Sequence, residues 1–292
     1  MREYIAEQGA TLGIQALGIA PPIDEVRALH PWARSVVCAA VSYLPPDPGP
    51  VPEGIRGLVA RVARGADYHD VVRAKLTRLA DALRSRMGTC RMEIHLDTSP
   101  LPERKLAAMS GIGWLGKNCC LYVDGCGSYV ALGEIVTSIP LPPTTSQQPS
   151  RCGDCTLCLD SCPAHALTAP GVLDRSRCLS SLTQSGGSIP GELQKAMENR
   201  IYGCDICQEV CPHNQGLTPV NTEFAVSEFP GPYPELLPLL IMTRSNFEAL
   251  VRPSSIGWIG RSRLRRNAAI AIMNAGGAAA DGIKEILDSL AN

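Results

Sequence analysis

One segment sets the architecture of this chain: Cys152-Gly153-Asp154-Cys155-Thr156-Leu157-Cys158-Leu159-Asp160-Ser161-Cys162-Pro163, with the spacing C-x2-C-x2-C-x3-C-P. A second run from Cys204 to Pro212 has the spacing C-x2-C-x3-C-P, and Cys178 stands alone between the two runs. Short spacings let one loop place successive thiolates around a single metal centre. The proline that ends each run cannot continue a helix through the ligands. Together the runs and Cys178 supply eight thiolates.

The first run has the spacing with which bacterial two-cluster proteins hold cubane iron–sulfur clusters. Eight thiolates are two sets of four, so the sequence predicts two 4Fe-4S clusters and the transfer of single electrons. In two-cluster proteins the fourth cysteine of such a run ligates the other cluster. This rule predicts one set with Cys152, Cys155, Cys158 and Cys211, and a second set with Cys162, Cys178, Cys204 and Cys207.

Two alternatives stay open for the cysteine segment. Pairs with C-x2-C spacing also bind zinc, although the register of the first run and its terminal proline favour iron–sulfur clusters. Two clusters can also serve only to stabilise a fold, but neighbouring clusters more often form an electron-transfer path. The second run has one cysteine fewer than the first and relies on Cys178. The segment therefore differs from a free-standing ferredoxin.

Composition limits the other classes of function. The chain has 292 residues, 45% hydrophobic and 19% charged, which is enough for one large domain or two to three smaller ones. Aromatic residues make up 4%, so an extended base-stacking platform is not expected. The net charge is −1, but Arg244 to Arg266 contains six arginines against Glu248 alone. This stretch is either a patch for phosphates or a solvated helix face.

The compartment follows from what the sequence lacks. No apolar run is close to the length of about 20 residues that a helix needs to span a bilayer. The first residues show no signal-peptide pattern. We therefore expect a cytoplasmic protein whose 13 cysteines are thiols or metal ligands. The five outside the cluster sets are predicted to be small buried apolar residues: Cys38, Cys90, Cys119, Cys120 and Cys126.

Hydrophobic periodicity predicts an α+β domain over residues 1–141. Helices are expected at about 3–18, 68–87 and 103–110, and strands at 34–43 and 92–96. Residues 118–123 and 129–136 are expected to be strands paired with each other. A linker by composition, 141–149, leads to the ferredoxin-like two-cluster segment, 151–217.

The remaining residues, 218–292, are predicted to form a short C-terminal helical segment of the HEAT-like kind. From Arg244 onward two or three helices are expected. Their apolar face is predicted to contain Leu264, Ala268, Ile270, Ala271 and Met273, and Gly276-Gly277 is expected to end the helix.

Several motifs in a fixed order resemble one family, the epoxyqueuosine reductases, which are cobalamin-dependent enzymes of queuosine tRNA modification. The resemblance covers nearly the whole chain. The motifs that carry it are Ala66-Asp67-Tyr68-His69, Leu96-Asp97-Thr98-Ser99-Pro100, Glu103-Arg104, Gly111-Ile112-Gly113-Trp114-Leu115-Gly116-Lys117-Asn118, Gly127-Ser128-Tyr129, Leu132-Gly133-Glu134, Arg177-Cys178-Leu179-Ser180 and Gly203-Cys204-Asp205-Ile206-Cys207.

The resemblance implies reduction of an epoxide on the wobble nucleoside of tRNA, with electrons passing from the clusters to cobalamin. It implies that Asp97 is the proton donor and that cobalamin contacts Asp97, Leu121, Leu132, Ser180 and Asp205. An apolar, cobalamin-covered site is expected to raise the pKa of Asp97. The alternatives are a helix-capping role for Asp97 and ordinary core roles for Leu121 and Leu132.

The sequence also departs from the family pattern. Ala60 stands where some members have a cysteine near the cobalt, and the tail is shorter than in members with a fuller helical-repeat domain. The D-x-H-x-x-G signature of histidine-ligated cobalamin is absent, so His69 is either an axial ligand or a structural residue. We expect a monomer whose partners are tRNA and an external electron donor. A dedicated electron carrier and a cobalamin reductase of another substrate, such as an organohalide, remain alternatives.

Overall fold

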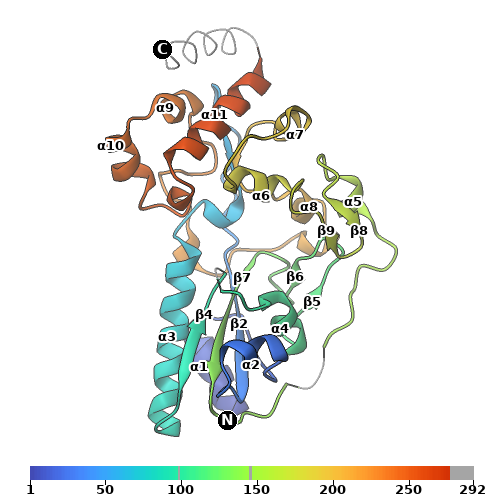
Figure 1. The fold of residues 1–292 in the computed structure, drawn as a ribbon, viewed down its shortest axis with the longest axis vertical. Coiled ribbons are helices and arrows are strands. Elements are labelled where there is room, and N and C mark those ends of the chain that lie inside the picture. Colours follow the sequence, from blue (N-terminus) through green and yellow to red (C-terminus); the bar gives the residue numbers. More distant parts are fainter. Residues whose placement is uncertain (98, 145–146, 277–292) are drawn as a thin grey trace. The chain divides into compact units, whose positions relative to one another are not determined.

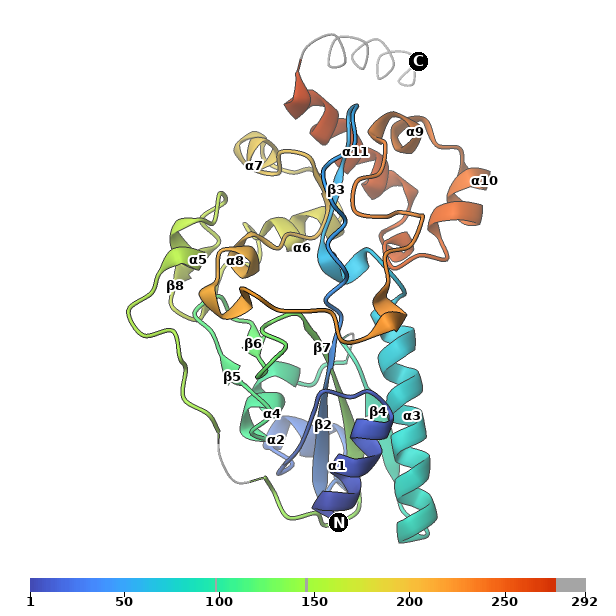
Figure 2. The same cartoon turned by 180° about the vertical axis from the view of Figure 1, so that it is seen from behind.

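The computed structural model describes residues 1–97, 99–144 and 147–276 (Figures 1 and 2). The chain divides into two compact units. The first unit contains Met1–Leu44, Tyr68–Thr156 and Cys211–Glu223, and the second contains Pro45–Asp67, Leu157–Val210 and the chain from Phe224 onward. Residues of the predicted segments 1–141 and 151–217 therefore contribute to both units.

The first unit is built on a four-stranded antiparallel sheet. Its strand order is β1 (Ala16–Ala20), β2 (Ser35–Ser42), β7 (Val130–Thr137) and β4 (Met92–His95). Every residue of β2 is buried. An uncharged, partly β-branched strand of this kind suits the middle of a sheet that is covered on both faces.

Helices cover both faces of this sheet. On one face lie α1 (Arg2–Thr11) and α3 (Tyr68–Met87), and on the other lie α2 (Asp24–Leu29) and α4 (Glu103–Met109) (Figures 1 and 2). In α3 the buried residues recur at helical spacing and include Val72, Leu76, Leu79 and Leu83. The helices predicted at 68–87 and 103–110 and the strands predicted at 34–43 and 92–96 are confirmed.

The first predicted helix is too long. α1 ends at Thr11, and Ala16–Ala20 is the edge strand β1, which pairs with β2. The chain leaves the helix at Gly13, whose φ of +65° lies in the left-handed region that glycine adopts without strain. Gly18, the predicted helix end, therefore lies inside a strand.

The predicted pairing of 118–123 with 129–136 is also wrong. β6 (Leu121–Tyr122) pairs with β5 (Trp114–Leu115) to form a small hairpin, whereas β7 pairs with β2 and β4. The isolated bridge between Val123 and Gly127 closes the turn that separates the hairpin from β7. Because most of β7 is buried, it occupies the middle of the sheet and not the edge of a hairpin.

The second unit contains short elements around two small sheets. β3 (Leu58–Val59) pairs in parallel with β10 (Arg200–Tyr202), and β8 (Leu167–Ala169) pairs with β9 (Val172–Leu173). The helices are α5 (Leu157–Asp160), α6 (Leu179–Gln184), α7 (Gly191–Ala196), α8 (Ile206–Glu209), α9 (Leu236–Ile241), α10 (Arg244–Asn246) and α11 (Arg261–Ala275). In the part of the chain that the structure describes, no helix is long and apolar enough to cross a lipid bilayer.

Helix α11 organises the core of the second unit. Its residues Leu264, Ala268 and Ala271 pack in one cluster with Leu236 and Leu240 of α9. Met273 is 40% exposed, so its predicted place on the apolar face is wrong. Nine residues beyond Leu264 correspond to a rotation of about 180° around a helix, which turns Met273 away from the core.

The helix ends where the sequence predicts. α11 stops at Ala275, and Gly276 follows with a φ of +70°. Gly277, the other half of the predicted stop, lies outside the described residues. The HEAT-like character of the tail stays a prediction.

Candidate metal centres and active site

The eight predicted cluster cysteines lie in loops and short helices. All 13 cysteines of the chain are free thiols. Cys158 lies in α5, Cys207 lies in α8, and Cys178 directly precedes α6. Thiols that are not consumed in disulfides are what metal ligation requires.

The four cysteines predicted to share one cluster all belong to the second unit: Cys162, Cys178, Cys204 and Cys207. Within that unit Cys162 and Cys204 pack against the same buried apolar group, which includes Leu179 and Met197. The backbone N–H of Ala166 donates a hydrogen bond to Cys162 Sγ at 3.3 Å. The structure therefore brings together two cysteines from different runs.

Hydrogen-bond donors surround Cys152 and Cys211 in the first unit. The backbone N–H of Lys117 donates to Cys152 Sγ at 3.4 Å, and the Tyr122 hydroxyl hydrogen bonds to Cys211. Asn118 Nδ2 donates to the Tyr122 hydroxyl oxygen at 2.9 Å. Such donors compensate the negative charge of iron-bound thiolates, so this arrangement fits an iron–sulfur cluster.

Aromatic rings cover the same donors. Trp114 stacks on Tyr122 with ring centroids 4.5 Å apart, and His213 meets both rings edge-on. Cys120 and Cys152 pack against this group. Because solvent exposure and hydrogen bonds set the potential of a cluster, these rings and donors would tune the potential of a cluster held by Cys152 and Cys211.

The segment after Cys211 is fixed to the first unit by Asn214. Its side chain accepts a hydrogen bond from the backbone N–H of Ser128 at 2.8 Å and donates one to Ser128 Oγ at 2.8 Å. Gly127 has a φ of +57°, and a Cβ there would collide with Asn214 Oδ1. Only glycine permits this close approach.

The five other cysteines do not all behave as predicted. Cys38 and Cys126 are buried, which confirms the prediction for these two. Cys90, Cys119 and Cys120 are only half-buried, so the prediction is wrong for them. Cys119 and Cys120 lie in the turn between β5 and β6, where the chain reverses at the surface.

Asp97 lies in the loop that follows β4, with a φ of +32°. His69 Nε2 is 3.4 Å from Asp97 Oδ2, and Tyr68 also hydrogen bonds the carboxylate. The hydrogen bond from His69 lowers the pKa of Asp97, against the opposing effect of burial. In the protein alone, in which the Asp97 side chain is 55% exposed, the pKa is therefore lowered, and the rise expected under bound cobalamin stays a prediction.

The helix-cap alternative for Asp97 does not hold. The residue that caps α4 is Pro102, and no side chain caps that helix. The Asp97 carboxylate faces His69 and Tyr68 at the start of α3 instead. This contact also gives His69 a role within the protein.

Two acidic residues that sequence reasoning assigned no role lie near Asp97. Burial, followed by the charge of Asp97, raises the pKa of Glu103 to about 7. Burial raises the pKa of Glu134 well above its usual range, and the charge of Glu103 raises it further. The available signal was the presence of a carboxylate in the middle of Val130–Thr137, an otherwise apolar and mostly buried strand.

Leu121 and Leu132 belong to the packing of the first unit. Leu121 is 3% exposed and lies in the core cluster that includes Leu106 and Val136. Leu132 is half-buried and packs against the same cluster. Their core role is therefore observed, and their contact with cobalamin stays a prediction.

Ser180 and Asp205 belong to the second unit. Ser180 lies in α6, and its hydroxyl accepts a hydrogen bond from Gln184 Nε2 at 3.2 Å. Asp205 is buried, and its carboxylate accepts the backbone N–H of Arg61 at 2.7 Å. Burial raises the pKa of Asp205, and the hydrogen bond from Arg61 opposes this rise. The side chain of Asp205 thus ties the Arg61 turn, next to Ala60, to α8.

The basic stretch is largely used inside the second unit. Arg266 donates to the carbonyl oxygens of Leu182, Ser185 and Gly187. Arg261, Arg263 and Arg265 likewise donate to the carbonyl oxygens of Met242, Ile259 and Leu240. These arginines are structural in part, so neither predicted alternative, a phosphate patch or a solvated face, describes them fully.

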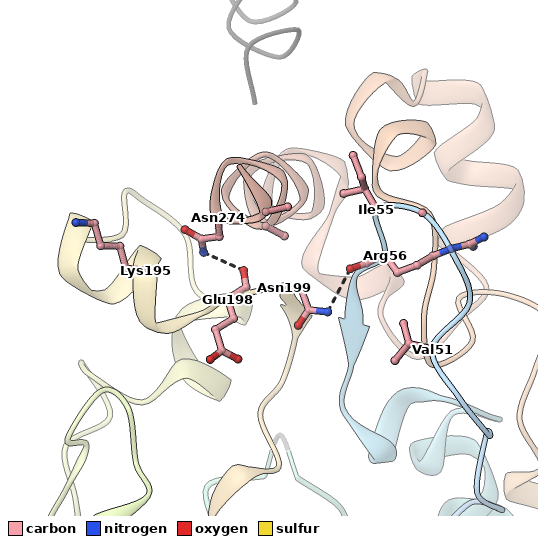
Figure 3. A pocket seen from close by; sticks show the side chains of 10 residues that line it. Val51, Ile55, Arg56, Lys195, Glu198, Asn199 and Asn274 are labelled. Carbon is pink, nitrogen blue, oxygen red and sulfur yellow. Dashed lines mark hydrogen bonds between the residues drawn. The ribbon is translucent and has the colours of Figure 1, made fainter. Parts of the chain in front are cut away.

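A pocket of about 560 Å³ lies within the second unit, between the segment 51–56 that precedes β3, the region of α7 and the end of α11 (Figure 3). Asn274 Nδ2 donates to the carbonyl oxygen of Glu198 at 2.9 Å, and Asn199 Nδ2 donates to that of Arg56 at 3.2 Å. None of the predicted site residues lines this pocket. It is therefore separate from the candidate site.

Comparison with known proteins matches two segments of this chain to protein families. Residues 151–214 match the family of 4Fe-4S double cluster binding domains. Residues 24–98 match the family described as epoxyqueuosine reductase QueG, DUF1730. The epoxyqueuosine reductase of Staphylococcus aureus (strain NCTC 8325 / PS 47) is 34% identical over 306 residues, which cover 93% of this chain and 80% of that protein. The chain belongs to the epoxyqueuosine reductase family.

Other members of this family differ in length. The epoxyqueuosine reductase of Bacillus subtilis (strain 168) is 39% identical over 254 residues, which cover 84% of this chain. The match spans only 64% of the length of that relative. A crystal structure of an epoxyqueuosine reductase with an epoxyqueuosine-modified tRNA-Tyr stem loop has a TM-score of 0.86 and 34% identity. The match covers 94% of this chain and 81% of the chain in that crystal structure.

Proposed function

We propose that this protein reduces epoxyqueuosine to queuosine at the wobble position of tRNA. The observation that carries the proposal is the family membership, which includes matches over residues 24–98, where Asp97 lies, and over the cluster-binding segment 151–214. A related enzyme was crystallised with an epoxyqueuosine-modified stem loop, which supports tRNA as the partner. The reducing cytoplasm, where thiols persist, suits the 13 free cysteines.

The chain carries a binding domain for two 4Fe-4S clusters. We assign the ligands as predicted: Cys152, Cys155, Cys158 and Cys211 for one cluster, and Cys162, Cys178, Cys204 and Cys207 for the other. The donors at Cys152 and Cys211 support the first set, and the shared packing of Cys162 and Cys204 supports the second.

Cobalamin is the second cofactor of the proposal. Asp97, Leu121, Leu132, Ser180 and Asp205 are the residues that we assign to its site. When bound, it supplies a redox-active cobalt able to act on the epoxide carbon. Asp97 fits this arrangement because its carboxylate is 55% exposed and within reach of a ligand. The Asp205 carboxylate already accepts a hydrogen bond from the backbone N–H of Arg61, so we assign the contact of Asp205 with cobalamin to its backbone.

Asp97 is assigned the role of proton donor to the epoxide oxygen. General-acid catalysis makes that oxygen a better leaving group. His69 and Tyr68 hold the carboxylate in position, and His69 keeps it ionised in the free protein. A substrate that covers Asp97 removes water from it and thereby raises its pKa toward the value that an acid requires.

The proposal is tested with tRNA that carries epoxyqueuosine, under anaerobic conditions, with an added electron donor. Protein loaded with iron and cobalamin is expected to convert the nucleoside. Asp97→Asn is expected to keep both cofactors and to lose turnover. Asp81→Asn changes an exposed carboxylate that pairs with Arg84 on α3, so it should retain turnover. Clusters that cycle without converting the nucleoside would instead indicate an electron carrier.

A further inference from the structure

Two glutamates of the first unit have buried carboxylate oxygens without hydrogen-bond partners. Glu134 is 0% exposed, and neither of its carboxylate oxygens has a partner among the described residues. Glu103 is the first residue of α4, and its Oε1 atom is also buried without a hydrogen-bond partner among the described residues. The Glu103 carboxylate also accepts a hydrogen bond from the backbone N–H of Asp97. Burial without a partner strongly disfavours the ionised form of such a group.

The groups that face Glu134 supply no positive charge to offset an anion. In the sheet register Glu134 lies opposite Cys38 of β2 and His95 of β4. Burial, with a further effect of His30, lowers the pKa of His95, which favours its neutral form. Glu103 approaches from α4 and opposes ionisation of Glu134.

The surroundings of Glu103 are mixed. The charge of Asp97 opposes ionisation of Glu103, whereas its hydrogen bond to the Asp97 amide and the charges of Arg104 and His69 favour it. The balance places the pKa of Glu103 at about 7. Near neutral pH Glu103 therefore exchanges its proton and Asp97 is ionised, while burial without a partner favours the neutral form of Glu134.

We propose that Glu103 stores a proton beside Asp97 and recharges Asp97 during turnover. This inference deepens the proposed function and rests on it. It follows from the position of the Glu103 carboxylate, which accepts the Asp97 backbone N–H and has one buried oxygen without a partner, beside the exposed carboxylate of Asp97.

The stoichiometry of the proposed reaction gives such a store a use, because Asp97 must be protonated more than once in each turnover. Conversion of an epoxide to an alkene breaks two carbon–oxygen bonds and releases the oxygen as water, which takes two electrons from the external donor and two protons. When the substrate fills the site, Glu103 passes its proton to Asp97, which delivers it to the epoxide oxygen and becomes a carboxylate again. Solvent water then reprotonates Glu103, which recharges Asp97 for the second proton.

The direction of transfer depends on the substrate. In the free protein Glu103 holds its proton more tightly than Asp97 does, so transfer to Asp97 is unfavourable. A nucleoside that covers Asp97 excludes water and raises the pKa of Asp97 toward that of Glu103. The proton then moves only when the site is filled. Glu103 acts through Asp97, so it is a positioning residue and not a group that touches the substrate.

The first test measures single turnover of the stem-loop substrate by the loaded enzyme across a pH series that brackets 7. The wild-type rate is expected to fall about tenfold per pH unit above the pKa of Glu103. In Glu103→Gln the rate should be lower at every pH and should no longer fall with rising pH above 7. In Glu103→Asp, which restores a carboxyl group, a pH-dependent fall in the rate should return. Glu25→Gln, which changes an exposed carboxylate paired with Lys105, is the matched control and should follow the wild type.

The second test needs no turnover. Infrared difference spectra of the loaded wild-type protein between acidic and alkaline pH should show a protonated carboxyl band that titrates near 7 and is absent from Glu103→Gln. If the wild type converts the substrate but Glu103→Gln keeps the wild-type pH profile, the inference is wrong. If Glu103→Gln does not fold, the absence of a band titrating near 7 from the wild type alone overturns the inference. Failure of the wild type to convert the substrate counts against the proposed function instead.

Discussion

The Nε2 atom of His69 lies 3.4 Å from the Oδ2 atom of Asp97, and this contact is the largest cause of the lowered pKa of Asp97. His69 is the second residue of α3, a 20-residue helix packed on the sheet, whereas Asp97 lies in the loop after β4. A rigid helix therefore fixes the protonation state of a residue on a loop.

Replacement of His69 by alanine is expected to raise the pKa of Asp97, because the carboxylate loses its main hydrogen bond while burial still opposes its charge. The titration of Asp97 can be followed by carbon-13 NMR of aspartate-labelled protein. His165→Ala, a change at an exposed histidine of the second unit, should leave that titration unchanged. An Asp97 titration that is the same in His69→Ala and the wild type would contradict the assigned role of the contact.

Replacement of Tyr122 by phenylalanine is expected to make the potential of one cluster more negative. The variant keeps the ring that stacks on Trp114 but removes the hydroxyl that bonds Cys211. Loss of a hydrogen bond to a ligand sulfur stabilises the oxidised cluster relative to the reduced one. Redox titration by electron paramagnetic resonance measures the shift.

The control for this change is Tyr4→Phe, which removes a hydroxyl bonded to the carbonyl oxygen of Ala82 on α3. It should leave both cluster potentials unchanged. A Tyr122→Phe protein with full iron content and wild-type potentials would show that the hydroxyl does not tune the cluster.

The cysteine pattern was readable from the sequence because ligand spacing is a local property. The strand at Ser35–Ser42 and the helix at Tyr68–Met87 were predictable for a similar reason, since each has a continuous or periodic apolar pattern. The pairing of Val130–Thr137 was not, because the choice between β6 and the central strands depends on distant segments.

The acidic neighbours of Asp97 show the same limit. Glu103 and Glu134 look like ordinary charged residues in the sequence, and their pKa values depend on burial that only the packing of α4 on β7 creates. In the sequence the arginines of α11 were either a patch for phosphates or a solvated helix face. Several instead donate to backbone carbonyl oxygens of preceding segments.

Replacement of Asn267 by alanine is expected to destabilise the second unit by roughly 1–3 kcal/mol. Asn267 is 0% exposed and donates to the carbonyl oxygens of Thr183 and Ile201 at 2.7 and 2.8 Å. Its loss leaves two buried acceptors without this donor. Thermal unfolding measures the change, and Asn274→Ala, at an exposed position of the same helix, should cost less. Equal losses for the two variants would argue against the buried bonds as the cause.

Neutralisation of the arginines should separate stability from tRNA binding. Arg266→Gln is expected to lower the unfolding temperature, because its guanidinium bonds three carbonyl oxygens. Arg244→Gln, at an exposed position, should leave stability unchanged and weaken tRNA binding if this stretch contacts phosphates. Stem-loop affinity at two salt concentrations tests this point. Unchanged affinity and salt dependence in Arg244→Gln would place the tRNA contact elsewhere.

The stability of the first unit is expected to fall as the pH rises through 7. The pKa of Glu103 in the folded protein, about 7, lies above its ordinary value of 4.5, so the folded state binds this proton more tightly than the unfolded state. The contribution is fully present below about 4.5 and is lost as the pH rises to about 7. Linkage puts it at roughly 3 kcal/mol.

Hydrogen exchange of the β7 amides, corrected for intrinsic exchange rates, measures this dependence in the loaded protein. Glu103→Gln removes the titrating group and should flatten the slope between these pH values, whereas the exposed Glu25→Gln should not. The comparison isolates Glu103, because every other titrating group is common to the variant and the wild type. A slope in Glu103→Gln as steep as in the wild type would mean that Glu103 is not the residue that holds the proton.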